Sequence, residues 1–149
     1  RRRHTRSLCD WSSDVCSSDL QVLLCPQEPW EFIQLGNCGS PLETEAGWLV
    51  LTHGVGPMRE YCIGAALLDR ADPTRVIGRL RQPLLRATDD ERDGYVPNVV
   101  YSCGGLIHAD QLWLPYAVSD RATRMARVPL PELLRLLLAS PPRAQTCVF

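Results

Sequence analysis

His53 is the residue in the first half of the chain whose type and setting best suit chemistry; it lies in the stretch 47–69, GWLVLTHGVGPMREYCIGAALLD. An imidazole can donate an N–H hydrogen bond to an anionic oxygen, so it suits the binding of a negatively charged ligand. Gly54 and Gly56 follow closely, and residues without a side chain let a ligand approach the backbone. From these residues alone, a structural role and a ligand-binding role for His53 are equally open.

The sequence around His53 predicts two strands separated by a turn. Residues 48–52, WLVLT, are rich in aromatic and β-branched residues, and GVGP at 54–57 is typical of a turn. We therefore expect His53 at the end of the first strand. Residues 61–68 are apolar almost throughout, which predicts a strand buried on both faces.

The rest of the chain is interpreted as further short strands followed by one helix. The charged segment 88–94, TDDERDG, is interpreted as a solvated loop. Residues 130–138 combine an early proline with leucines at helical spacing, which predicts an amphipathic helix. Such a pattern is typical of an all-β sandwich, barrel or propeller. The other predicted strands are 30–33, 76–85, 96–104, 106–107, 112–116 and 123–128, with a hairpin turn at 108–111.

The net charge and the cysteine pattern limit the kinds of partner and the compartment that we expect for this protein. The net charge of −1 favours neither a nucleic-acid nor an acidic-polymer partner, and no apolar run approaches the roughly 18 residues of a membrane span. The cysteines after residue 20 show no CxxC or metal-ligand spacing, so we expect buried, unpaired thiols in a cytoplasmic protein, without a metal site. These residues are Cys25, Cys38, Cys62, Cys103 and Cys147.

The first twenty residues do not read as natural protein. Residues 10–20, DWSSDVCSSDL, match one reading frame of a common sequencing-adapter oligonucleotide. We interpret 1–20 as a non-native, adapter-derived segment and exclude it from fold reasoning. The expected organisation is then a domain piece over 21–140, whose natural sequence continues upstream, and a tail over 141–149.

A series of short motifs runs in one order between about Trp30 and Leu138. The motifs are Pro41, Thr44, Gly47–Trp48–Leu49, His53–Gly54–Val55, Gly64–Ala65–Ala66–Leu67–Leu68–Asp69 and Asp72–Pro73. Together they resemble glycoside hydrolase family 130, the β-mannoside phosphorylases and related β-mannosidases.

The resemblance implies a fold and an activity. This C-terminal fragment would supply about the last two blades of a five-bladed β-propeller, with a C-terminal helix. Phosphate, as co-substrate, would attack a β-mannoside oligosaccharide with inversion and release mannose 1-phosphate, without a metal or organic cofactor. The family's acid lies in a Glu-Asp-Pro-Arg type motif that this sequence lacks. No catalytic residue is therefore assigned, the fragment alone is expected to be inactive, and a homo-oligomer remains open.

The resemblance also assigns binding roles. His53 matches a position that contacts the attacking phosphate. Asp120 ends a segment, Tyr116–Asp120, that is similar to the family's Tyr-Gly-Ala-Ala-Asp motif, whose carboxylate binds hydroxyls of the mannosyl ring, although the residues alone favour a turn role there. Substrate-binding residues expected to border the same cavity are Tyr95, Asn98 and Tyr101.

Two departures from the family pattern keep other activities open. Gln34–Leu35–Gly36 stands where phosphorylases usually have a Lys-x-Gly motif, and a neutral amide cannot supply the point charge of lysine. Ala117–Val118–Ser119 replaces Gly-Ala-Ala, a change that is conservative in size. Hydrolysis of β-mannosides therefore remains an alternative to phosphorolysis, as does a non-catalytic sugar-binding propeller.

Overall fold

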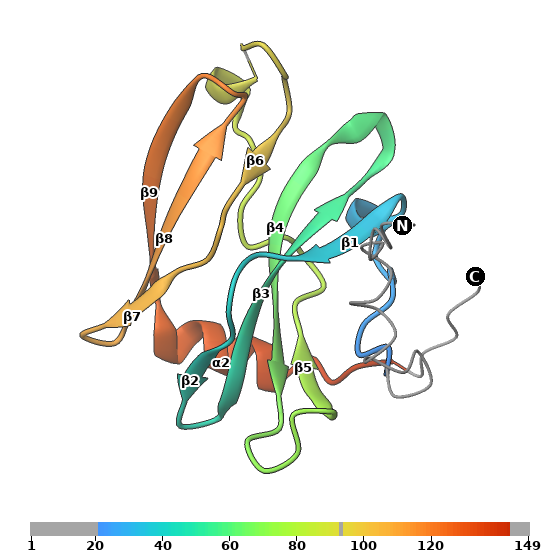
Figure 1. Cartoon of the computed structure of the whole chain (residues 1–149), viewed down its shortest axis with the longest axis vertical. Helices are drawn as coiled ribbons and strands as arrows, with labels where there is room; N and C mark the ends of the chain where they lie inside the picture. The colour runs from blue at the N-terminus through green and yellow to red at the C-terminus, as the bar shows by residue number, and fades with distance from the viewer. Residues whose placement is uncertain (1–20, 93, 144–149) are drawn as a thin grey trace, which may run out of the picture.

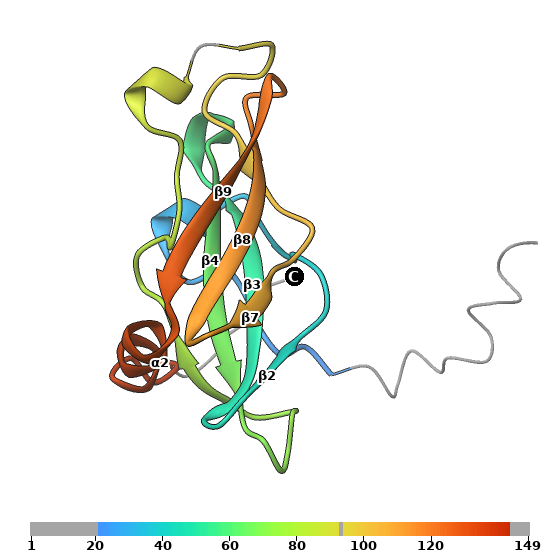
Figure 2. The ribbon, with the colours of Figure 1, turned by 90° about the vertical axis from the view of Figure 1, so that its left-hand side faces the viewer.

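The computed structural model describes residues 21–92 and 94–143. The described chain is mostly β-structure with one α-helix near its C-terminal end, as predicted. Two antiparallel sheets pack face to face, and the helix lies across one end of both (Figures 1 and 2). The predicted adapter-derived segment and the end of the predicted tail lie outside the described residues.

The first sheet contains the His53 strand at its centre. Strands β1 and β2 both pair with one side of β3, and β4 and β5 follow on the other side, all antiparallel. Strand β4 is buried along seven of its eight residues, which confirms the prediction of a strand covered on both faces. The bounds are β1 (Gln34–Asn37), β2 (Leu42–Thr44), β3 (Gly47–Val55), β4 (Tyr61–Leu68) and β5 (Val76–Arg79).

The second sheet has the same arrangement as the first four strands of the first sheet. Strands β6 (Val100–Tyr101) and β7 (Leu106–His108) pair with one side of β8 (Gln111–Val118), and β9 (Ala122–Pro129) pairs with the other. The β7–β8 turn is confirmed, since both of its central residues adopt the left-handed conformation of a tight hairpin. Most side chains of β9 are exposed, and among the described residues β9 forms the edge of this sheet.

One hydrophobic core joins the two sheets and the helix α2 (Leu130–Leu138). Leu133 and Leu137 of α2 are 1% and 0% exposed, which confirms the predicted amphipathic helix. Burying such a side chain contributes about 1.5–3 kcal/mol, so the core fixes the sheets against each other. Its sheet members include Leu49, Leu51, Ile63, Val100, Leu112 and Leu114.

Among the described residues, short 3₁₀ helices lie before and between the strands: η2 (Pro29–Glu31), η3 (Pro57–Arg59) and η4 (Asp89–Glu91). The strand predicted at 30–33 is wrong, because Pro29 and a capping box between Glu28 and Glu31 favour a helical turn there.

Two other predicted strands, at 76–85 and 96–104, were too long. The strand predicted at 96–104 is reduced to β6, and Asn98 before it takes a left-handed φ of 64°. The strand predicted at 76–85 ends at Arg79.

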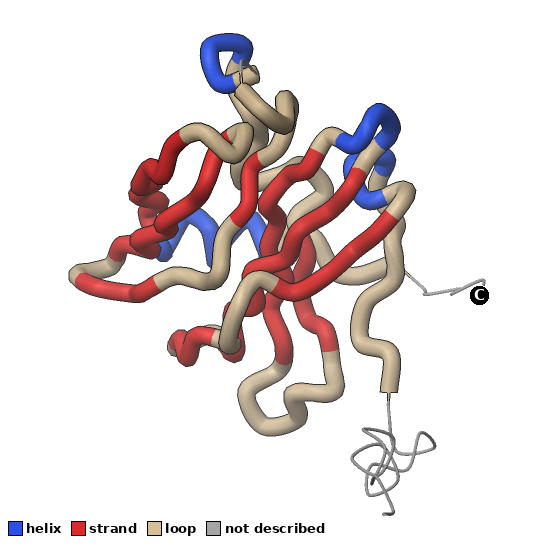
Figure 3. The backbone as a smooth tube through the Cα atoms, turned by 45° about the horizontal axis from the view of Figure 1, so that its top comes forward, coloured by secondary structure: helices blue, strands red, loops and turns tan. Residues whose placement is uncertain are grey.

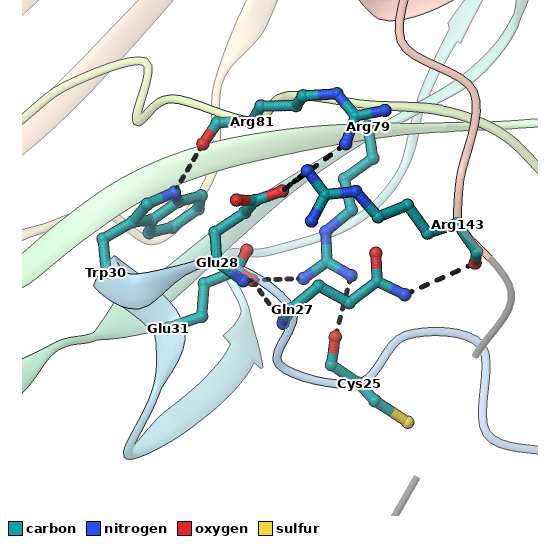
Figure 4. Close-up of polar contacts among 8 residues, drawn as sticks. All are labelled: Cys25, Gln27, Glu28, Trp30, Glu31, Arg79, Arg81 and Arg143. Atoms are coloured by element: carbon teal, nitrogen blue, oxygen red, sulfur yellow. Dashed lines mark hydrogen bonds and ion pairs between the residues drawn. The ribbon is translucent and has the colours of Figure 1, made fainter. Parts of the chain in front are cut away.

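A buried polar cluster covers the outer face of the first sheet (Figure 4). The Glu31 carboxylate accepts a hydrogen bond from Nη2 of Arg79 at 2.6 Å, and Nη1 of Arg79 donates to the Cys25 carbonyl at 2.7 Å. The Trp30 indole donates from Nε1 to the Arg81 carbonyl at 3.0 Å. The segment before β1 is therefore tied to β5 and to the residues that follow it.

The cysteines depart from the expectation of unpaired, buried thiols. Cys25 is disulfide-bonded, and Cys103 is exposed. Cys38 and Cys62 are free and buried, and burial raises the pKa of each thiol to about 11. Both thiols are therefore protonated and unreactive near neutral pH.

Two negative findings concern the described ranges 21–92 and 94–143. No group of three or more His, Cys, Asp or Glu side chains there could hold a metal ion. Within the same ranges, no helix has the length and apolar character needed to cross a membrane.

Candidate phosphate- and sugar-binding site

His53 lies inside β3, not at its end as predicted. The strand continues to Val55 because β1 and β4 pair with it on both sides up to that residue. The half-buried imidazole lies 5.6 Å, centroid to centroid, from the ring of Tyr101 in β6. The fold thus brings together two of the predicted site residues, one from each sheet.

Cys38 lies beside one nitrogen of the His53 ring. Sγ of Cys38 lies 3.8 Å from Nδ1, and the Cys38 thiol is protonated because burial raises its pKa to about 11. In the tautomer in which this S–H donates to Nδ1, the ring N–H is on Nε2. Among the described residues, Nε2 has no hydrogen-bond partner, so in that tautomer its N–H is available to an anionic oxygen.

Gly36 supports the imidazole from below, and the sequence analysis did not identify it as a site residue. It lies opposite His53 in the β1–β3 pair, and a Cβ at this position would come within 2.3 Å of Cε1 of the ring. The ring therefore packs directly on the backbone of β1. The available signal was the glycine of the Lys-x-Gly motif, which Gly36 retains.

The expectation that Gly54 lets a ligand approach the backbone is wrong. The indole of Trp30 occupies that space, and a Cβ at Gly54 would lie 2.5 Å from its ring. A Cβ at Gly64, on the adjacent strand, would come within 2.4 Å of the same indole. Gly56 lies against the Trp30 backbone. These glycines hold the tryptophan that covers the back of the His53 strand.

Asp120 lies in the turn between β8 and β9. It is exposed and has a φ of 50°, and Ser119 before it has a φ of 51° and is buried. The location agrees with the turn role that the residues alone favour, and the exposed carboxylate is accessible to a ligand. Its role in sugar binding stays a prediction.

The segment between η4 and β6 carries two further predicted residues, Tyr95 and Asn98. Tyr95 is 90% exposed, and the backbone carbonyl of Asn98, which is half-buried, accepts a hydrogen bond from the Tyr61 amide at 3.0 Å. Ser119 holds this segment beside the Asp120 turn, since its amide donates to Val99 at 2.9 Å. Figure 3 shows the η4 loop, the β8–β9 turn and the η3 turn at one end of the molecule.

Glu91 was missed, because the segment 88–94 was interpreted as solvated. The Glu91 residue is 5% exposed, and its carboxylate accepts hydrogen bonds from the Thr88 amide at 2.9 Å, the Tyr116 hydroxyl at 3.2 Å and the Arg124 guanidinium at 2.5 Å. The Thr88 N–H is the main cause that lowers the pKa of this carboxyl, and Tyr116 and Arg124 add to it against the opposing effect of burial. The Thr-x-x-Glu spacing is a capping box and was the signal in the sequence.

Comparison with known proteins decides the family. A family model described as β-1,4-mannooligosaccharide phosphorylase, glycoside hydrolase family 130, matches residues 17–138, which is most of the chain. The chain belongs to glycoside hydrolase family 130. The predicted family resemblance is therefore confirmed. The match includes residues 17–20, and the adapter origin of segment 1–20 stays a prediction.

Relatives within family 130 share both sequence and structure with this chain. A β-1,2-mannobiose phosphorylase of Thermoanaerobacter sp. strain X514 is 42% identical over 92 residues, which cover 61% of this chain and 30% of that protein. The Listeria innocua β-1,2-mannobiose phosphorylase, solved with β-1,2-mannobiose, superimposes with a TM-score of 0.71 at 35% identity, covering 78% of this chain and 33% of that one.

The description of another solved structure mentions hydrolases in the same family. It says that the GH130 family of mannoside phosphorylases contains glycoside hydrolases that target β-1,2 mannosidic linkages in Candida mannan. This structure has a TM-score of 0.62 at 30% identity, covering 72% of this chain and 33% of that one. The chain thus spans about a third of the length of the relatives it matches.

Proposed function

We propose that this chain is the C-terminal part of an inverting β-mannoside phosphorylase. The observation that carries the proposal is Nε2 of His53, which has no hydrogen-bond partner among the described residues. The His53 ring lies opposite Gly36 and beside Tyr101. An N–H donor in that position suits phosphate, and two of the relatives named above are β-1,2-mannobiose phosphorylases. The repeated strand plan of the two sheets supports a role as about the last two blades of a five-bladed propeller.

The proposed reaction divides its work between this chain and the rest of the enzyme. A phosphate oxygen, bound by His53, forms a bond to the anomeric carbon while the glycosidic bond breaks. The leaving oxygen takes a proton from an acid in the part of the enzyme outside these residues. Asp120 accepts hydrogen bonds from the sugar hydroxyls, and Tyr95, Asn98 and Tyr101 border the sugar.

The proposal needs no metal or organic cofactor, since phosphate is the co-substrate and the donors are protein groups. We also propose that the enzyme works in the cytoplasm, because Cys38, Cys62 and Cys103 are free thiols, although Cys25 is disulfide-bonded. The proposal leaves open whether copies of the complete enzyme assemble into a homo-oligomer.

A hybrid enzyme tests this function. In the hybrid, residues 21–143 replace the matching third of the Listeria innocua β-1,2-mannobiose phosphorylase. Its release of mannose 1-phosphate from β-1,2-mannobiose is measured with and without phosphate, alongside the parent enzyme. We expect phosphate-dependent release of mannose 1-phosphate.

Two outcomes would contradict the phosphorylase proposal. Release of free mannose at a rate that phosphate does not change would assign hydrolysis, the activity that Gln34 in place of lysine would favour. A hybrid that unfolds cooperatively and binds β-1,2-mannobiose, but catalyses neither its phosphorolysis nor its hydrolysis, would assign sugar binding alone.

A further inference from the structure

The carboxylate of Glu91 lies where the η4 loop meets strands β8 and β9, close to the predicted sugar-binding residue Asp120. Its oxygens accept hydrogen bonds from the Thr88 amide, from Tyr116 of β8 and from Arg124 of β9. The Ser119 hydroxyl donates to the Glu91 backbone carbonyl. A single buried residue thus joins the η4 loop to both strands that flank the Asp120 turn and to the turn itself.

These contacts reach the predicted sugar-binding residues from two sides. Ser119 directly precedes Asp120 and is 1% exposed, so holding its side chain fixes where the turn presents the next carboxylate. On the other side, the Ser119 carbonyl accepts from the Val96 amide at 3.4 Å, and its amide donates to Val99 at 2.9 Å. Asn98 lies between those two contacts.

Gly94 allows the η4 loop to pack closely against the β8–β9 turn. A Cβ at Gly94 would lie 2.5 Å from the Ser119 carbonyl oxygen, so only a residue without a side chain lets the η4 loop approach the turn this closely. The Tyr95 side chain after Gly94 is 90% exposed, so it does not fix the loop. Glu91 is 5% exposed and contributes buried side-chain contacts to this loop.

We propose that Glu91 is a positioning residue for sugar binding: its carboxylate fixes the η4 loop against the β8–β9 turn and so orients Asp120 and Asn98 toward the mannosyl group. The inference rests on the proposed function for the identity of the ligand. The anchoring of the turn does not depend on it. Preorganised side chains bind a ligand without the entropic cost of ordering a loop at that moment.

The first test measures the anchor without any activity. Amide hydrogen exchange is compared in the full 149-residue chain and in its Glu91→Gln variant, which keeps the side-chain shape but loses the charge. We expect the amides of Thr88, Val96 and Ser119 to exchange about tenfold faster or more, because hydrogen bonds to charged groups are the strong ones. Amides of β3 and β4 should not change.

The matched control is Asp89→Asn. It removes one carboxylate from the same 3₁₀ helix, but the Asp89 side chain is 91% exposed and forms an exposed ion pair with Arg92 at 3.2 Å. Tyr116→Phe is a milder second variant, since it removes one donor and leaves the Glu91 charge in place. If the Asp89 control loosens the loop as much as Glu91→Gln does, or neither changes it, the proposal is overturned.

The second test measures the functional consequence in the hybrid enzyme. We expect Glu91→Gln and, less strongly, Tyr116→Phe to raise KM for β-1,2-mannobiose about tenfold, with KM for phosphate unchanged because His53 is held by the first sheet. A merely structural role would lower the active fraction, and hence kcat, without moving either KM.

The two proposals fail separately. An unmutated hybrid that makes no mannose 1-phosphate contradicts the proposed function, while the exchange experiment still decides whether Glu91 anchors the turn. An active hybrid in which Glu91→Gln leaves KM for the mannoside unchanged, or raises both KM values equally, overturns the positioning role.

Discussion

The buried pair of Glu31 and Arg79 should be among the most costly to break in this chain. Glu31→Gln keeps the size of the side chain and removes its charge. The guanidinium of Arg79, whose side chain is 7% exposed, would then lie buried beside a neutral amide. The Gln27 and Glu28 amides donate to the same Glu31 oxygen as Arg79 does, at 3.0 and 3.1 Å, so all three donors would then share a neutral amide oxygen.

The expected loss follows from that geometry. Removing one partner of a buried, hydrogen-bonded ion pair costs about 3–5 kcal/mol, because the other charge stays buried without compensation. The pair Glu43–Arg70 is the matched comparison: its N–O distance is 2.7 Å against 2.6 Å, but its side chains are 56% and 59% exposed. Glu43→Gln should therefore cost only about 0–1 kcal/mol.

Denaturant unfolding of the full chain, followed by tryptophan fluorescence, measures both variants. The double variant Glu31→Leu with Arg79→Met should be more stable than Glu31→Gln alone, since it removes the stranded charge. Equal losses for Glu31→Gln and Glu43→Gln would show that burial does not decide the cost, and the reasoning would be wrong.

Three further predictions concern the site and its support. In the hybrid enzyme, His53→Ala should raise KM for phosphate by about one to two orders of magnitude, because the lost hydrogen bond to a charged ligand is worth about 1.5–3 kcal/mol, and Gln34→Lys should lower it; an unchanged KM for phosphate in both would exclude these roles. Gly54→Ala should destabilise the chain by about 1–3 kcal/mol, through collision with Trp30, as measured by denaturation. The carboxyl of Glu91 has a folded-state pKa below the ordinary 4.5, so its contribution to stability is present above that value and is lost as pH falls through the folded-state pKa. Acid titration of wild type should therefore show a loss that Glu91→Gln lacks.

Local sequence patterns predicted the elements whose period and turn residues agree. The apolar run of β4, the hairpin turn before β8 and the leucine spacing of α2 each contain their own evidence over a few residues. The strand predicted at 30–33 was wrong although a local signal was present, because Pro29 and the Glu28–Glu31 capping box favour a helical turn.

The packing of the site could not be predicted in this way, because it depends on residues that are distant in the chain. Nothing near Gly54 indicates that Trp30 fills the space above it. A charged segment around Glu91 resembles a solvated loop unless Tyr116 and Arg124 are known to meet its carboxylate. The His53–Tyr101 contact joins two sheets, and pairing between sheets leaves no periodic signal in the sequence.

The exposed strand β9 affects the self-association of the isolated chain in solution. Among the described residues, β9 pairs with β8 on one side and with no strand on the other. An unpaired strand edge can recruit the same edge of another copy, although the charge of Arg127 on β9 opposes close approach. Light scattering or gel filtration of the isolated chain would therefore measure self-association through this edge and its dependence on salt. It would not measure the oligomeric state of the complete enzyme.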